Sequence, residues 1–167
     1  MSTEYYLKDI TRVLGIKRTA LQQWLDRGYV APSVGAAGGQ GFRNVWSKED
    51  VLNLAAFQSL LDHGFSRGEA ARALQEKQTL FISGNICERR DRKEFQEEDI
   101  FGYDTAIAKV TCLNGAVYNV VVTRGIPETT IFTAIDSAAK FLGVPAGIAA
   151  VKVVSITDAM RRAAENL

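Results

Sequence analysis

The sequence has few of the residues that build metal sites, disulfide frameworks or membrane spans. Its 167 residues include two cysteines, one histidine and three prolines. Cys87 and Cys112 lie far apart and form no CxxC pair, so they and one histidine cannot supply the four ligands of a structural zinc site. The longest nearly apolar stretch, 146–154, is too short to cross a bilayer and contains Lys152. We therefore expect no metal, no cofactor and no membrane contact.

The chain also lacks a strong excess of one charge. Its net charge is +1, so the total charge does not by itself indicate a nucleic-acid partner. Apolar residues make up 47% of the chain, which is enough to form the cores of one medium domain or two small ones. The start of the chain is polar and contains Glu4, unlike a secretory signal, and predicts a cytoplasmic protein.

A catalytic constellation is missing as well. Asp104, Asp136 and Asp158 fall on separate predicted elements, and no motif links them. His63 falls in the last turn of a predicted helix, where a cation complements the helix dipole. We therefore expect that the protein is not an enzyme.

Two short helices are predicted near the N-terminus. Leu7, Ile10 and Leu14 repeat at helical spacing, and Gly15 ends that helix. A second helix is expected at about 17–27, with Leu21, Trp24 and Leu25 on one face, and ends at Gly28. Two short helices joined by a tight turn containing glycine are typical of a helix-turn-helix.

The first turns of the second helix carry candidate DNA contacts. In a helix-turn-helix the second helix enters the major groove. Lysine and arginine suit phosphates and guanine, and glutamine can pair with adenine through two hydrogen bonds. The solvated face of an ordinary amphipathic helix carries the same residue types, so this helix alone leaves both interpretations open. The candidates are Lys17, Arg18, Thr19, Gln22 and Gln23.

A glycine-rich segment follows this helix. Residues 35–41 contain four glycines, and the next five residues, 42–46, resemble a strand. This order predicts a β-hairpin wing whose basic residue reaches a phosphate, and the alternative is an ordinary surface loop. The candidate contacts on the wing are Gln40, Arg43 and Asn44. Two capping boxes, Ser47-x-x-Asp50 and Ser66-x-x-Glu69, then predict the starts of two further helices.

The order of these elements resembles the DNA-binding domain of MerR-family regulators over about residues 5–77. The resemblance implies a winged helix-turn-helix that binds double-stranded DNA. It is distant, and closer to MerR-like proteins of phage and mobile elements than to metal sensors. The recognition helix has Gln22-Gln23-Trp24 where the family usually has Arg-Tyr-Tyr, and the family's long dimerising helix is not visible. The segments that carry the resemblance are 14–16, 20–21, 27–32, 41–43, 46–51 and 63–66.

The remaining residues predict a second domain at 79–167. Strands are expected at 79–87, 105–113, 116–123 and 148–156, and helices at 129–142 and 157–166. Asn114-Gly115 predicts a hairpin between two of the strands, and the charged stretch 87–101 predicts a solvated loop. This domain forms a homodimer, senses a small ligand or binds a protein partner. We expect the homodimer, because a single winged domain makes few phosphate contacts.

The sequence therefore predicts an α+β protein: an N-terminal, mainly helical winged helix-turn-helix at 1–78, then a small antiparallel sheet with two helices at 79–167. The expected function is a sequence-specific double-stranded DNA-binding transcription regulator. The alternative is an architectural or DNA-packaging winged helix-turn-helix protein of a phage or mobile element, of the excisionase or small terminase type.

Overall fold

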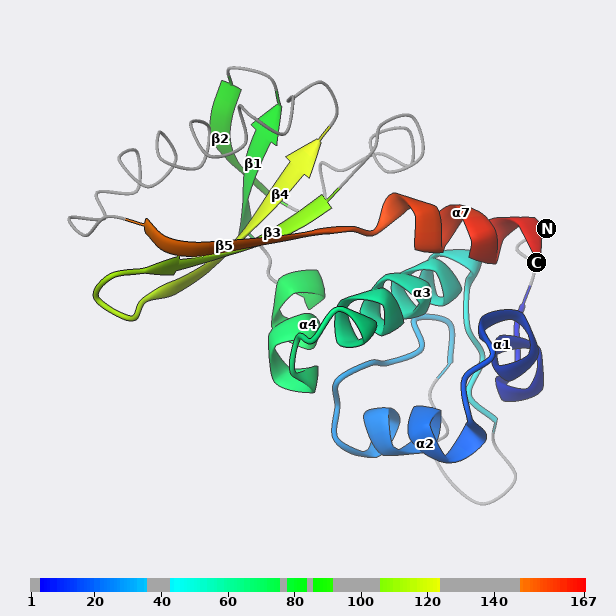
Figure 1. Cartoon of the computed structure of the whole chain (residues 1–167). Coiled ribbons are helices and arrows are strands. Elements are labelled where there is room, and N and C mark those ends of the chain that lie inside the picture. The colour runs from blue at the N-terminus through cyan, green and yellow to red at the C-terminus, as the bar shows by residue number, and fades with distance from the viewer. Residues whose placement is uncertain (1–3, 36–42, 76–77, 84–85, 92–105, 124–147) are drawn as a thin grey trace. The chain divides into compact units, whose positions relative to one another are not determined.

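The computed structural model describes residues 4–35, 43–75, 78–83, 86–91, 106–123 and 148–167 (Figure 1). The chain divides into two compact units, which are described here one at a time. The first unit combines residues 1–74 with 159–167, and the second contains residues 75–158. The expected division at 78/79 differs from this in one main respect, since the C-terminal residues 159–167 group with the N-terminal unit.

The first unit is helical. Its elements are α1 (Leu7–Leu14), α2 (Arg18–Asp26), α3 (Lys48–Asp62), α4 (Arg67–Gln75) and, at the end of the chain, most of α7 (Thr157–Glu165). The first four helices lie where the sequence predicted them. Gly15 follows α1 with a φ of 66°, a left-handed conformation that glycine adopts without steric cost, and this residue turns the chain toward α2.

Both predicted capping boxes are present. The Ser47 hydroxyl accepts a hydrogen bond from the Asp50 amide at 3.1 Å, and the Ser47 amide donates to the Asp50 carboxylate at 2.8 Å. Ser66 and Glu69 make the same reciprocal pair, at 3.3 and 2.8 Å. These bonds satisfy amide groups that the first turn of a helix leaves without partners, so they fix where α3 and α4 begin.

The core of the helical unit is built around α3. Trp24 of α2 packs edge-on against Phe57 of α3, with ring centroids 5.0 Å apart and planes at 67°. Helix α3 buries residues on most of its surface, which is typical of a central helix. The largest fully buried side chains of this unit are Trp46, Phe57, Ile10, Leu21, Leu52, Leu54, Leu60 and Val51.

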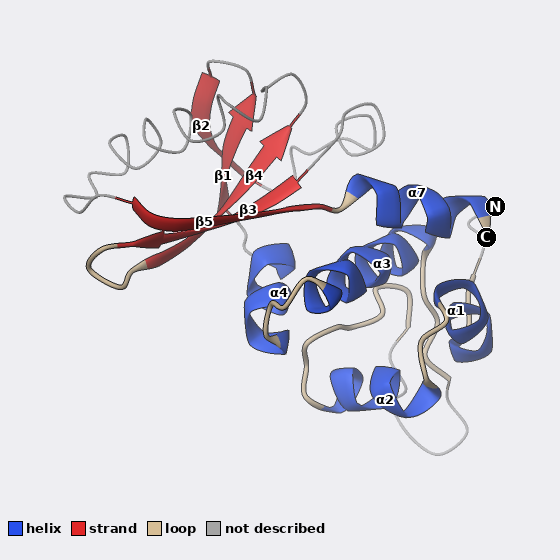
Figure 2. Ribbon diagram, viewed as in Figure 1, coloured by secondary structure: helices blue, strands red, loops and turns tan. Residues whose placement is uncertain are grey.

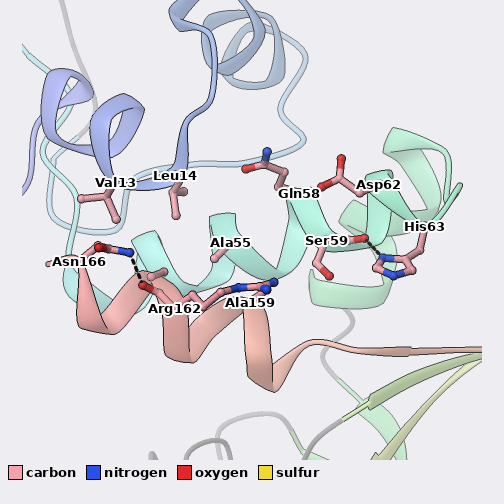
Figure 3. A pocket seen from close by; sticks show the side chains of 11 residues that line it. Val13, Leu14, Ala55, Gln58, Ser59, Asp62, His63, Ala159, Arg162 and Asn166 are labelled. Atoms are coloured by element: carbon pink, nitrogen blue, oxygen red, sulfur yellow. Dashed lines mark hydrogen bonds between the residues drawn. The ribbon is translucent and has the colours of Figure 1, made fainter.

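Helix α7 lies alongside α3 within the same unit (Figures 1 and 3). Its Met160 and Ala163 are buried, whereas Arg161, Arg162 and Glu165 are exposed. The helix therefore has one apolar face, and that face is already buried within the folded chain.

The second unit contains a five-stranded sheet in the order β2-β1-β4-β3-β5. The strands are β1 (Gln78–Ser83), β2 (Ile86–Asp91), β3 (Ala106–Cys112), β4 (Val117–Thr123) and β5 (Ile148–Ser155). Figure 2 shows the strands in red and the helices in blue, and together they confirm the predicted α+β class. The pairing is not wholly antiparallel as predicted, because β1 pairs with β4 in parallel.

The prediction of one strand at 79–87 was wrong, because this stretch belongs to two antiparallel strands, β1 and β2. The sequence between them is Gly84-Asn85, a dipeptide that favours tight hairpins. The charged residues 88–91 were predicted to be a loop but belong to β2, at the edge of the sheet. Edge strands commonly carry charge, which discourages pairing with other chains.

The predicted hairpin at Asn114-Gly115 is confirmed. Strands β3 and β4 are antiparallel partners, and Gly115 has a φ of 82°. The Cys112 amide donates to the Ala116 carbonyl at 2.8 Å, and the Asn114 side chain accepts from the Ala116 amide at 3.0 Å. Cys112 is a buried free thiol. The helix predicted at 129–142 and the rest of the predicted charged loop, 92–101, lie outside the described residues.

Candidate nucleic-acid interface

Helix α2 separates its apolar and polar residues onto opposite sides. Leu21 and Trp24 are buried, at 0% and 5% exposure, and tie the helix to the core. Its exposed residues face solvent from the N-cap to the last turn, and five of them are the candidates named from the sequence: Lys17, Arg18, Thr19, Gln22 and Gln23. These five exposed side chains, two at the N-terminal end of α2 and three along it, are here called the α2 surface.

The turn before α2 is short and anchored. Only Gly15, Ile16 and Lys17 separate α1 from α2, and Ile16 is 6% exposed. The Lys17 carbonyl accepts hydrogen bonds from the Ala20 amide at 2.9 Å and the Leu21 amide at 3.1 Å. A buried residue inside the turn fixes the two helices relative to each other, as a helix-turn-helix requires.

The cations of the α2 surface form no ion pair in the part of the chain that the structure describes. Among the residues that the structure describes, no ion pair within 4.0 Å involves Lys17 or Arg18, and Arg12 pairs with Asp9 instead. An exposed ammonium or guanidinium without a carboxylate partner can meet a phosphate without first breaking an ion pair. The electrostatics of this surface therefore suit a polyanion.

Gln22 and Asp26 are linked on the same surface. The Gln22 side-chain amide donates to the Asp26 carboxylate at 2.8 Å, one helical turn further on. A primary amide has two N–H groups and a carbonyl oxygen, so this bond holds the Gln22 side chain and leaves it further hydrogen-bonding groups. Asp26 was not among the candidate DNA contacts named from the sequence, and its spacing of four from Gln22 is the signal that could have identified it.

The base of the predicted wing is present. Gly35 and Val45 exchange two backbone hydrogen bonds, of 3.1 and 2.9 Å, and Trp46 exchanges two more with Tyr5, of 3.0 and 2.9 Å. These bridges bring three separate segments of the chain together in short antiparallel pairs. Arg43 is exposed and Asn44 half-buried just before Val45. Gln40 lies outside the described residues.

Asp50 connects the wing to the helical core. Its carboxylate accepts hydrogen bonds from the Ser33 amide at 2.9 Å, the Ser33 hydroxyl at 2.8 Å and the Ser47 amide at 2.8 Å. Ser33 follows α2 and leads into the wing, whereas Ser47 caps α3. One side chain therefore links Ser33, in the segment that follows α2, to the first turn of α3. The sequence identified Asp50 as a capping residue but not as this link.

Replacement of Asp50 by alanine is expected to destabilise the helical unit by about 3 kcal/mol, since the cap contributes about 1 kcal/mol and each of the two hydrogen bonds from Ser33 about 1. Both tryptophans of the chain, Trp24 and Trp46, lie in this unit, so urea unfolding followed by tryptophan fluorescence reports on it. Glu49→Ala is the matched control, because Glu49 is exposed in the same helical turn. Equal losses in the two variants would contradict the role of Asp50.

No group of three or more histidine, cysteine, aspartate or glutamate side chains that could hold a metal occurs among the described residues. His63 caps the end of α3, and its Nδ1 lies 2.7 Å from the Ser59 carbonyl oxygen, in agreement with the predicted structural position. No helix in the described part of the chain is long and apolar enough to cross a membrane.

Comparisons with known proteins agree with the arrangement of the N-terminal elements. A family model described as MerR HTH family regulatory protein matches residues 5–77. A search of curated proteins finds no match to the chain. The matched range contains α1, the turn, α2, the wing base and helices α3 and α4 in that order. Residues 5–77 of this chain therefore form a MerR-like helix-turn-helix domain.

Proposed function

We propose that the protein is a transcription regulator that binds double-stranded DNA in a sequence-specific manner, through the α2 surface and the wing. The single observation that carries the proposal is the α2 surface itself. Two cations are exposed at the N-terminal end of α2, and a hydroxyl and two amides are exposed along it, while Leu21 and Trp24 fix the helix in the core. Such a surface can enter a major groove as a rigid body, with cations for phosphates and amides for base edges.

Arg43, with Gln40 and Asn44 beside it in the sequence, is the proposed contact of the wing with the DNA backbone. Arg43 is exposed two residues before Val45, which pairs with Gly35. A phosphate contact from this residue carries no sequence information but sets the position and angle of α2 in the groove. The α2 surface would supply the base contacts.

The proposal is tested by selection from a pool of random-sequence duplexes with the full chain. We expect the pool to converge on a motif, because Gln22 and Gln23 discriminate between base edges. Failure of the pool to converge while duplexes are still bound would favour an architectural DNA-binding protein. Absence of any duplex binding at low salt would refute the proposal.

The two glutamines are expected to set base preference. Replacing Gln23 by alanine should reduce discrimination at one position of the selected motif by about 1–3 kcal/mol, the worth of a bidentate base contact, and leave binding to unrelated duplexes nearly unchanged. Gln22→Ala should act at a second position and also release Asp26, its partner at 2.8 Å. Competition binding with single-base variants of the motif measures both. A uniform loss on every sequence would show that these residues contact only the backbone.

We also propose that the chain forms a homodimer through the sheet unit. The sequence predicted this role for the domain at 79–167, most of which is the sheet unit. Leu113, Val117 and Val153 are large apolar side chains that are 72%, 49% and 39% exposed there. Strand β5 is the last strand of the sheet order, so one of its edges has no neighbouring strand among the described residues. Apolar side chains and an open edge favour self-association, and paired half-sites need two copies of the reading helix.

In sedimentation at tens of micromolar protein, we expect the full chain to be a dimer. Dimerisation at this concentration corresponds to a free energy of association of about 6 kcal/mol or more in favour of the dimer. Replacement of Leu113 by serine with Val117 and Val153 by threonine should shift the chain toward monomer, because the apolar contact area is lost. Val34→Thr, which changes an exposed apolar residue of the helical unit, is the control. A monomeric wild-type chain would refute the dimer and leave the sheet unit for a protein partner or a ligand.

A further inference from the structure

A groove of about 330 Å³ lies within the helical unit, between α1, α3 and α7 (Figure 3). Its volume falls in the range of pockets that hold small molecules. None of the residues proposed to contact DNA lines it. The groove is therefore a feature separate from the α2 surface.

The groove has an apolar part. Val13 and Leu14 of α1 line it together with Ala55 of α3 and Ala163 of α7. Ala55 and Ala163 are buried, and Val13 and Leu14 are half-buried. The small side chains of the two alanines leave room between α3 and α7 that an apolar group of a ligand can fill.

Two opposite charges also line the groove. Asp62 comes from the end of α3 and Arg162 from α7, and both side chains are exposed. They form no ion pair within 4.0 Å with each other or with any other residue that the structure describes. The lining thus offers one negative and one positive group beside an apolar surface.

Two of the neighbouring polar side chains already have hydrogen-bond partners. The His63 ring nitrogen Nδ1 lies 2.7 Å from the Ser59 carbonyl, and the Asn166 side-chain amide donates to the Arg162 carbonyl at 2.7 Å (Figure 3). These contacts use backbone oxygens, so the Arg162 guanidinium and the Asp62 carboxylate are the charged groups that a ligand would meet.

We propose that this groove binds a small zwitterion with an apolar side chain, which is the chemistry of an apolar α-amino acid. The Arg162 guanidinium would bind the carboxylate through two parallel hydrogen bonds, Asp62 would accept from the ammonium group, and the side chain would lie on the apolar part. A ligand with one charge would gain a charge-assisted contact with only one of the two side chains, and an uncharged ligand with neither.

Binding is tested on the full chain without DNA, so the result is independent of the proposed function. The probe is L-leucine at millimolar concentration, followed by amide chemical shifts of the labelled protein. We expect saturable shifts at residues 58–63 and 159–166. Isocaproate lacks the ammonium group of leucine and isoamylamine lacks its carboxylate, and each should bind at least about tenfold more weakly, the loss of one charge-assisted contact.

Variants assign the contacts. Arg162→Gln and Asp62→Asn should each weaken leucine binding about tenfold or more, whereas Arg72→Gln, an exposed site outside the groove, should leave it unchanged. Leucine should also raise the midpoint of the tryptophan-detected unfolding transition, because a ligand of the folded unit stabilises it. No shifts at these residues, equal binding of all three probes, or insensitivity to both variants would each overturn the proposal.

Discussion

Replacement of Lys17, Arg18 and Arg43 by alanine together is expected to weaken duplex binding roughly 100- to 1,000-fold at about 0.1 M salt. Each charged contact with a phosphate contributes about 1–1.5 kcal/mol, and 1.4 kcal/mol corresponds to a factor of ten. Removal of three phosphate contacts should also reduce the slope of log affinity against log salt by about 2.7, since each contact contributes about 0.9. Fluorescence anisotropy across a salt series measures both quantities.

The control for this triple variant removes the same charge elsewhere. Lys8, Lys152 and Arg161 are also exposed, and none of them lies on the α2 surface or the wing. Their replacement by alanine changes the net charge of the protein by the same amount. If this variant loses as much affinity as the first, the effect comes from overall charge, and the proposed placement of the DNA contact is wrong.

The second large effect concerns α7. Replacement of Met160 by alanine is expected to destabilise the helical unit by about 2–4 kcal/mol, because the side chain is 4% exposed and a buried methionine leaves a cavity when truncated. Since residues 159–167 belong to the unit that contains Trp24 and Trp46, the loss should appear in the tryptophan-detected urea transition.

Glu165→Ala is the control for Met160, because Glu165 is exposed on the same helix. A tryptophan-detected transition that does not move in Met160→Ala would mean that α7 does not stabilise the N-terminal unit. The same grouping implies that a fragment ending at residue 78 lacks part of the unit that holds the recognition helix, so DNA-binding experiments should use the full chain.

The sequence predicted the helical elements of the DNA-binding domain well, because their ends depend on local chemistry. A left-handed glycine ends α1, and serine with an acidic residue three positions later begins α3 and α4. Each signal lies within a few residues of the structure that it determines. The exposure of Thr19, Gln22 and Gln23 also followed from helical spacing alone.

The long-range features were harder to predict. The helical spacing of Met160 and Ala163 indicates that one face of α7 is buried, but not that it is buried against the N-terminal unit, nearly a hundred residues away from α3 in the sequence. Strand β2 was missed because its charges suit an edge strand as well as a loop. The link from Asp50 to Ser33 spans seventeen residues and has no local signature.

The most direct test of the central claim is hydrogen exchange of the full chain with and without the selected duplex. We expect slower exchange in α2 and in the preceding turn, at residues 16–27, and around Arg43, because DNA covers these amides and restricts their opening. Protection confined to the sheet unit, or none at residues 16–27 when the duplex is saturating, would contradict the assignment of DNA binding to the α2 surface.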